Sequence, residues 1–200
     1  FKLYGIGDQV WLGDANYFSA GGGGLSARTT VGDRGLLEAF VEERRRDFSD
    51  SNNFPTASQQ SGDLLSAAVT SDLRFGALHW TARAGFDQNR AIFDYYSYKR
   101  YSIDMAFPYA FALPVFGTPH QFVIAPTIGF SWANYDAPNA IIDPVTVRND
   151  REQRYGAIFD AQVYKNVGVR TQVQYIKIDS SLPNYTTDNL SVSIGPTARF

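Results

Sequence analysis

The feature that most constrains this sequence is a period-2 alternation of apolar and polar residues, which recurs along most of its 200 residues. In the segment 78–87, Leu, Trp, Ala or Phe occupies every second position, with His, Thr, Arg, Gly or Asp between. A strand sends alternate side chains to opposite faces, whereas a helix would scatter this set around its circumference. The same split recurs in the segments 65–75, 100–111, 122–132, 154–163 and 169–175. Almost every charge falls on one face, so the chain is predicted to be all-β.

Composition narrows the class of β protein. Tyr and Phe contribute 12 and 15 residues, as expected where strands need β-formers and membrane interfaces need amphipathic rings. The longest apolar run, Ala106–Gly117, is too short for a helical membrane span and is broken by Pro108 and Pro114. Mean hydropathy is only −0.25, but half of each strand in a membrane barrel is polar. The net charge of −2 gives no support for nucleic-acid binding, and the absence of Cys excludes disulfides and thiolate metal sites.

The N-terminal quarter alternates less regularly. Leu36–Phe48 has the composition of an amphipathic helix, but as a strand it sends most of its charges to the polar face. Glu43 and Arg45 then lie on the apolar face, which is tolerable only at a membrane rim. We therefore predict a strand there. Residues 17–31 alternate around a run of four glycines, and Phe1–Leu12 is β-like with an ambiguous face.

Connection lengths predict the topology. Short connections at 32–35, 76–77, 113–121 and 165–168 alternate with longer ones at 13–16, 47–62, 88–98, 134–153 and 179–189, the first of which is short for its class. This alternation predicts one domain over 1–200, with about ten antiparallel up-and-down strands. Pro108, Pro126 and Pro196 fall inside expected strands, where each removes a hydrogen-bond donor. We expect bulges or a locally opened seam at these positions.

Aromatic placement predicts which face is outside. One set of rings lies near the short connections and a second near the long loops, and both belong to the apolar face: Phe75, Trp80, Phe111 and Phe122, then Tyr101, Trp132, Tyr155 and Tyr175. Two such girdles one membrane apart are typical of transmembrane barrels. A soluble barrel such as a lipocalin would instead turn its apolar face inward. The expected fold is therefore a closed antiparallel transmembrane β-barrel, with short periplasmic turns and long external loops.

The C-terminal segment carries a family resemblance. Asn189–Phe200 alternates up to a final aromatic, Phe200, and resembles the assembly signal of Gram-negative outer-membrane barrels, which the barrel-assembly machinery reads. Arg44–Phe48 and Tyr95–Tyr101 resemble strand ends of barrels fused to periplasmic tetratricopeptide repeats, which serve exopolysaccharide secretion and surface-lipoprotein assembly. The resemblance implies an outer-membrane location, contact with lipid and lipopolysaccharide, and a periplasmic module or exported cargo as partner. No signal peptide is visible, so we expect Phe1 to be either a mature start or a cut inside a longer protein.

The expected inward face carries charges of both signs. The candidate lumen site consists of Glu42, Arg44, Arg74, Arg83, Arg100, Asp104, Arg154, Asp160 and Arg170. These charges could pair and fill a narrow lumen, or they could form an arginine-biased passage for an anionic solute or polymer. We expect pairing. Two functions stay open: a porin-like or export channel, and a plugged structural or adhesive barrel whose loops at 47–62 and 134–153 bind an external partner.

The sequence predicts no enzyme. His79 and His120 are the only histidines, and the alternation places His79 inward, near Asp72, at the end with short connections. Known barrel enzymes place their sites at the outer rim, so His79 is expected to fill the lumen. The oxygen-rich Asp47–Asn53 lacks the spacing of an EF-hand loop. We therefore expect no catalytic residue, no metal and no cofactor.

Overall fold

The computed structural model describes residues 1–75, 78–115, 118–164 and 166–198. These residues form one antiparallel sheet of eleven strands, so the all-β prediction is confirmed. The strands are β1 (Lys2–Leu12), β2 (Ala15–Thr30), β3 (Gly35–Phe48), β4 (Gly62–Phe75), β5 (Leu78–Ala91), β6 (Tyr98–Ala106), β7 (Tyr109–Val115), β8 (Thr118–Pro138), β9 (Val147–Tyr164), β10 (Val167–Ser180) and β11 (Thr187–Ala198). Single 3-10 turns interrupt three loops: η1 (Ala57–Gln60), η2 (Asp94–Tyr96) and η3 (Pro183–Tyr185). In this part of the chain, no helix has the length and apolar character needed to cross a membrane.

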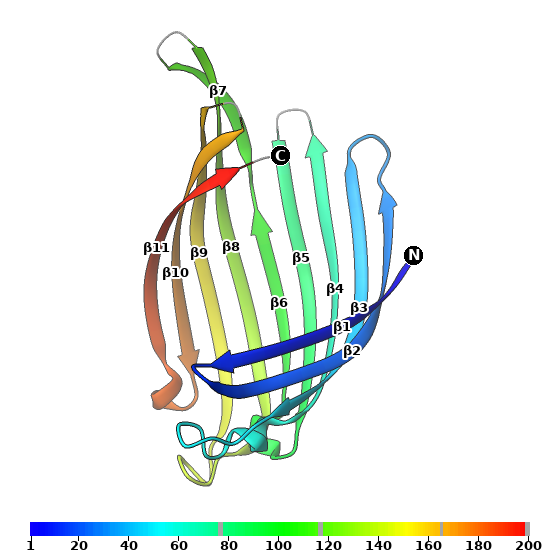
Figure 1. Cartoon of the computed structure of the whole chain (residues 1–200), viewed down its shortest axis with the longest axis vertical. Helices are drawn as coiled ribbons and strands as arrows, with labels where there is room; N and C mark the ends of the chain where they lie inside the picture. The colour runs from blue at the N-terminus through cyan, green and yellow to red at the C-terminus, as the bar shows by residue number, and fades with distance from the viewer. Residues whose placement is uncertain (76–77, 116–117, 165, 199–200) are drawn as a thin grey trace.

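The sheet has up-and-down topology, because strands that are consecutive in the chain pair with each other. Figure 1 shows the short connections gathered at one end, drawn at the top, and the long loops with their 3-10 turns at the other. The sheet is curved, and β1 and β2 cross in front of the other strands in this view. In the described pairings β1 contacts only β2 and β11 contacts only β10. The sheet is therefore not closed, and barrel closure stays a prediction.

Prolines explain why eleven strands are seen where about ten are expected. β6 and β7 pair with β8 in one continuous register and form a single path that is interrupted at Phe107 and Pro108. The Phe107 N–H donates to the carbonyl oxygen of Pro126 over 3.0 Å, but Pro126 has no N–H to return the bond. The register runs through Pro126 and Pro196 without a shift, so the bulges expected at these two positions are absent from the described pairings.

Several strands extend further than the sequence predicts. β5 continues to Ala91, and the expected loop 134–153 shrinks to 139–146 between β8 and β9. The segment 113–121, expected as a short connection, belongs mainly to β7 and β8. Residues 118–121 pair with β7 but not with β9, and the β7–β8 hairpin projects beyond the other strands at the short-connection end (Figure 1). The alternation fades in these segments, but the backbone ladder continues because it needs no particular side chains.

The pairing register separates the two faces of the sheet completely. Directly opposite residues share a face, and one row of them crosses every strand except β7: Lys2, Ser26, Phe40, Ala68, Gly85, Ser102, Ser131, Glu152, Ile178 and Thr187. We call this face the polar face, because it carries the charges predicted to point inward, and the opposite one the apolar face. The row starts at the first residue of β1 and ends at the first residue of β11. Because these two strands run in opposite directions, their first residues belong to opposite ends of the sheet. The row of paired residues therefore runs obliquely to the strands, from one end of the sheet toward the other.

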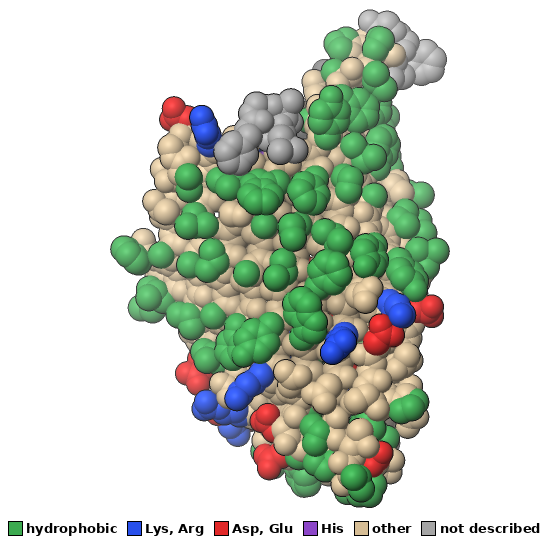
Figure 2. Space-filling model, turned by 180° about the vertical axis from the view of Figure 1, so that it is seen from behind, with side chains coloured by type: hydrophobic (Ala, Val, Ile, Leu, Met, Phe, Trp, Pro, Cys, Tyr) green, Lys and Arg blue, Asp and Glu red, His purple; other side chains and the backbone are tan. Residues whose placement is uncertain are grey.

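The apolar face is exposed on the outside of the curved sheet. Figure 2 shows a broad band of hydrophobic side chains there, with charged side chains gathered mainly toward the long loops. Val69, Ile103 and Val192 are 47%, 41% and 61% exposed. The apolar side chains that are buried in the described chain are small or lie in loops: Ala57, Ala68, Ala125 and Leu182. Continuous exposed apolar surface of this kind marks an interaction surface.

A carboxylate, that of Asp143, helps to hold the loop 139–146. Oδ1 of Asp143 accepts the backbone N–H groups of Val145 and Thr146 over 2.8 and 3.0 Å, and these bonds hold the pKa of Asp143 below its usual range. Because the folded pKa is lowered, this stabilisation is present above the unfolded pKa of about 4 and is lost as pH falls through the folded value. Hydrogen exchange should therefore show Val145 and Thr146 amides protected above that range and unprotected below it. Asp143→Ala should remove the protection at every pH, and persistence in this variant would contradict the assignment.

Candidate functional site

Ion pairs join neighbouring strands across the polar face. Arg100 of β6 lies opposite Asp87 of β5 and binds its Oδ2 over 2.7 Å, while the Ser66 hydroxyl donates to Oδ1 over 2.7 Å. Arg170 of β10 lies opposite Asp160 of β9 and binds both carboxylate oxygens, at 2.7 and 2.8 Å. Charge-assisted bonds of this geometry are the stronger kind of protein hydrogen bond. They tie strands together through side chains as well as through the backbone.

One ion pair spans an intervening strand. Arg154 of β9 reaches Asp104 of β6 over 2.7 Å, although β8 lies between them, and it also binds Glu152. Gly129 of β8 lies in register with both Arg154 and Asp104. A Cβ at Gly129 would stand 2.4 Å from the Asp104 Oδ1 and 2.9 Å from the Arg154 Nε. This contact therefore requires glycine at that point of β8.

A similar bridge ties β1 to β3. The Tyr4 hydroxyl donates to Glu42 over 3.2 Å, and its ring passes where a Cβ of Gly24 would stand, 2.7 Å away. Arg44 binds Glu42 over 2.5 Å and Asp8 of β1 over 3.1 Å. The Gly21–Gly24 run thus has a structural use in β2, since Gly24 lets a β1 side chain reach β3.

Two members of the predicted lumen set differ from the rest. Arg83 lies over the Phe40 ring at 5.4 Å, and neither Arg83 nor Arg74 forms an ion pair with a described carboxylate. Glu42 and the six other charged positions of that set are paired as described above. The polar face carries them all. Phe200, predicted as an assembly signal, lies outside the described residues.

The histidines have ordinary partners. Nε2 of His79 lies 2.8 Å from Asp72 Oδ1, and Nδ1 of His120 lies 3.0 Å from the Gln162 carbonyl oxygen. Within the ranges that the structure describes, no three His, Asp or Glu side chains gather as metal ligands would.

A cavity that the sequence does not predict lies at the long-loop end. It measures about 320 Å³, and we call it the tyrosine pocket. Its walls come from β3, β5, β6, β8, β9 and the loops around η1, η2 and η3, and its principal side chains are Arg46, Asn89, Tyr95, Tyr96, Tyr98, Tyr135, Arg148 and Tyr185. The aromatic density of the segment 95–101 is the one sequence signal that points to it, because the other rings come from distant segments.

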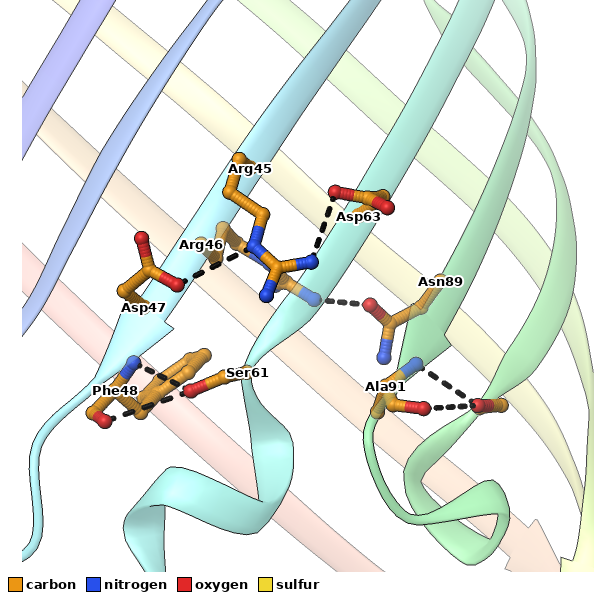
Figure 3. A network of polar contacts seen from close by, with 9 residues as sticks. Arg45, Arg46, Asp47, Phe48, Ser61, Asp63, Asn89 and Ala91 are labelled. Carbon is orange, nitrogen blue, oxygen red and sulfur yellow. Dashed lines mark hydrogen bonds and ion pairs between the residues drawn. The ribbon is translucent and has the colours of Figure 1, made fainter.

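Buried serines fix the loops that wall the tyrosine pocket. Ser61, only 5% exposed, accepts the Phe48 N–H over 2.8 Å and so ties the end of the η1 loop to the end of β3 (Figure 3). Ser97, 4% exposed, accepts the Ala91 N–H over 2.9 Å and closes the η2 loop in the same way. A buried hydroxyl that bonds to the backbone fixes a loop end, because a buried backbone group left without a hydrogen bond costs free energy.

The two arginines of the tyrosine pocket have different environments. Arg148 binds Asp150 over 2.6 Å, and its guanidinium lies over the rings of Tyr135 and Tyr185 at 4.6 and 3.5 Å. Its charge is therefore balanced by a carboxylate, and its plane is held by aromatic rings. Arg148 fixes the η3 side of the pocket and leaves no net charge for a ligand.

Arg46 has no such balance. Figure 3 shows that Arg45 and Arg46 point to opposite faces: Arg45 meets Asp47 and Asp63 at 3.3 and 3.4 Å, whereas Arg46 donates to the Asn89 amide oxygen. Nε of Arg46 is buried without a partner, and no carboxylate in the described ranges pairs with its guanidinium. A partly desolvated cation without a counter-ion is unfavourable unless an anion reaches it. Arg46 is therefore the feature of the pocket that favours an anionic ligand.

Neither family models, nor curated proteins, nor solved structures match this chain.

Proposed function

We propose that the sheet closes in a Gram-negative outer membrane and forms a barrel that conducts or exports anionic solutes, with the tyrosine pocket at its external mouth. The exposed apolar band, the polar interior and the segregation of long loops to one end support the membrane placement. In this orientation the short connections and the β7–β8 hairpin face the periplasm. The barrel carries out no chemistry, and its surroundings are lipid, lipopolysaccharide and the barrel-assembly machinery.

The observation that carries the transport proposal is that several arginines of the polar face bind no described carboxylate, whereas Arg44 and Arg154 each bind two. Arginines without a described carboxylate partner lie at several heights of the sheet: Arg28, Arg46, Arg74 and Arg83. Of the carboxylates on the same face, Glu38 lacks a described ion pair although it lies directly opposite Arg28, and Asp72 is held by His79. Low-dielectric walls strengthen the field of such cations and concentrate anions between them.

Single-channel recording in planar bilayers tests the proposal. The wild-type protein should conduct with a reversal potential that favours anions, and Arg46→Gln should reduce that preference because it removes the cation at the mouth. Arg45→Gln is the matched control, since Arg45 is the neighbouring residue but lies on the apolar face with two carboxylates. Cation preference in the wild type, or equal effects of the two substitutions, would contradict an anion-selective mouth.

A plugged structural or adhesive barrel is the second candidate. It is favoured by the ion pairs that fill the polar face and by the loops that converge on the tyrosine pocket. Electrical silence of a folded, inserted protein would favour this second function over transport. The long loops would then be the binding surface for an external partner.

A further inference from the structure

The tyrosine pocket contains a continuous row of side chains that crosses the polar face. Arg46 of β3 donates to Asn89 of β5 (Figure 3), and Asn89 pairs directly opposite Tyr98 of β6. Tyr98 pairs in turn opposite Tyr135 of β8, and the centroids of these two rings lie 5.5 Å apart. Arg148 of β9 follows, with its guanidinium 4.6 Å from the centre of the Tyr135 ring. All of these side chains line the same cavity.

The unbalanced charge of this row lies at its Arg46 end. Arg148, at the other end, is neutralised by Asp150 over 2.6 Å. The residues directly opposite Arg46 on the adjoining strands are Ala20 and Gly62, neither of which carries a charge. Within the described ranges, no Asp or Glu lines the cavity. Arg46 is therefore the cation of the pocket that is left to bind an anionic ligand.

The carboxylates that neighbour Arg46 on the polar face bind other groups. Glu42, on the same strand, binds Arg44 over 2.5 Å. Asp87, two residues before Asn89 on β5, binds Arg100 over 2.7 Å and also accepts the hydroxyl of a serine. A carboxylate brought by a ligand would therefore meet little competition for the Arg46 guanidinium, with which it can form charge-assisted hydrogen bonds.

The middle of the row favours a neutral ring. The Asn89 amide is only 4% exposed, and it is already used within the protein, because it accepts from Arg46 and donates to the Tyr96 carbonyl oxygen over 2.7 Å. The next side chains, Tyr98 and Tyr135, present aromatic rings. The face of such a ring carries the negative part of its quadrupole, so it repels an anionic group, whereas aromatic rings pack well against one another. The charged group of a ligand therefore belongs at Arg46, and the rest of the ligand should be flat and uncharged.

We propose that the tyrosine pocket binds small aromatic monocarboxylates, with the carboxylate on the Arg46 guanidinium and the ring against Tyr98 and Tyr135. The inference rests on the proposed function, because it names the class of anion that enters the barrel through this mouth. The cavity volume of about 320 Å³ is at the lower end of the range for ligand pockets, ~300–1,000 Å³. This volume suits a ligand with a single ring.

Isothermal titration calorimetry of the full chain, refolded in a non-ionic detergent at neutral pH, tests this site. The probes are benzoate, acetate, which has the charge without the ring, benzyl alcohol, which has the ring without the charge, glucuronate, which has a hydroxylated ring, and inorganic phosphate. Benzoate should bind the wild type more tightly than any of the other four.

Substitutions assign the two halves of the ligand. Arg46→Gln should weaken benzoate binding by about tenfold, because it removes a charge-assisted hydrogen bond, and Arg46→Lys should recover part of the loss. Arg45→Gln is the matched control on the opposite face and should bind benzoate like the wild type. Tyr98→Leu should also weaken benzoate binding. Tyr101→Leu, on the same strand but on the apolar face, should not.

Other outcomes overturn the inference. If benzyl alcohol binds as tightly as benzoate, or if the Arg46→Gln and Arg45→Gln variants lose equal affinity, Arg46 does not bind the carboxylate. If acetate, glucuronate or phosphate binds as tightly as benzoate, the rings do not select the ligand. Planar-bilayer recording separates this failure from that of the proposed function. An anion-selective channel without a preference for benzoate overturns only the ligand class, and a silent or cation-selective protein that binds benzoate overturns only transport.

Discussion

Cysteines placed at Gly7 and Ile194 should form a disulfide that joins β1 to β11 and closes the sheet. Counting β6 and β7 as one path, the eleven described strands make ten, so β1 and β11 run in opposite directions and can pair as an antiparallel ladder. Both residues lie on the apolar face, and a side chain at Gly7 would meet nothing within 4 Å. The natural chain has no Cys, so the engineered thiols are its only ones.

The choice of Gly7 and Ile194 follows from the row that crosses the sheet from Lys2 to Thr187. In a closed barrel, that row returns to β1 at a different residue from the one where it began. The number of residues between the two points is the stagger, which is determined by the number of strands and by their tilt. A stagger of about twelve residues of ~3.3 Å, across ten strands ~4.8 Å apart, gives a tilt of about 40°, within the usual range of ~35–45°. Thr187 would then lie level with Asp14, and Ile194 opposite Gly7.

Non-reducing electrophoresis after refolding measures this cross-link, which should also keep the folded form compact on heating. Gly7→Cys with Leu190→Cys is the control, because Leu190 shares the face but lies four residues, about 13 Å, nearer the start of β11. A stagger larger or smaller by two residues would move the cross-link to Pro196 or Val192. If Gly7→Cys joins none of these three positions, the sheet does not close at this seam with the proposed tilt.

Arg154→Glu should destabilise the fold more than any other single charge reversal on the polar face. It would place a third carboxylate beside Asp104 and Glu152 and remove the cation that both of them use. The Arg154 side chain is 24% exposed, so the cost should fall between the values for surface and buried pairs, about 2–3 kcal/mol. The expected measurement is a lower denaturant midpoint for unfolding in detergent micelles.

Two further variants make the Arg154 result specific. Arg45→Glu also reverses an arginine held by two carboxylates, but its side chain is 54% exposed, and it should lower the midpoint less than Arg154→Glu does, because water screens exposed pairs. Adding Asp104→Lys to Arg154→Glu restores a pair of opposite charge across Gly129 and should recover part of the loss. Equal midpoints for the two single reversals would show that the bridge over β8 contributes no more stability than a surface pair.

The sequence predicted the faces correctly because strand side chains have a period of two, so a run of charged positions cannot change face without a register slip. Arg83 and Asp104, for example, share the polar face as expected. The pairs themselves were harder to predict, since they depend on strand offsets. Arg100 pairs with Asp87, a residue of the adjacent strand that alternation alone could not select.

The remaining features depend on contacts between distant segments. The break between β6 and β7 arises partly from Pro126, whose missing donor faces Phe107 on another strand. The tyrosine pocket brings Tyr185 to Arg148 and Tyr135 only after the loops have folded over the strand ends. The requirement for Gly129 likewise appears only when Asp104 and Arg154 are placed on either side of it. Local sequence patterns carry only part of this information, namely the positions of the prolines and the aromatic density of the segment 95–101.

The β7–β8 hairpin makes the apolar surface uneven in height. Its rings Tyr109, Phe111 and Phe122 lie on the apolar face and stack with centroids about 6 Å apart, and the stack continues to Phe159 of β9. Tyr109 and Leu113 are 53% and 50% exposed. In a bilayer this sector would present a longer hydrophobic stretch than the sectors of β2 and β3, and such hydrophobic mismatch is relieved by tilt or by local thickening of the lipid. If the sheet closes and inserts as proposed, the barrel should therefore lean, and the membrane around it should be thickest beside the hairpin.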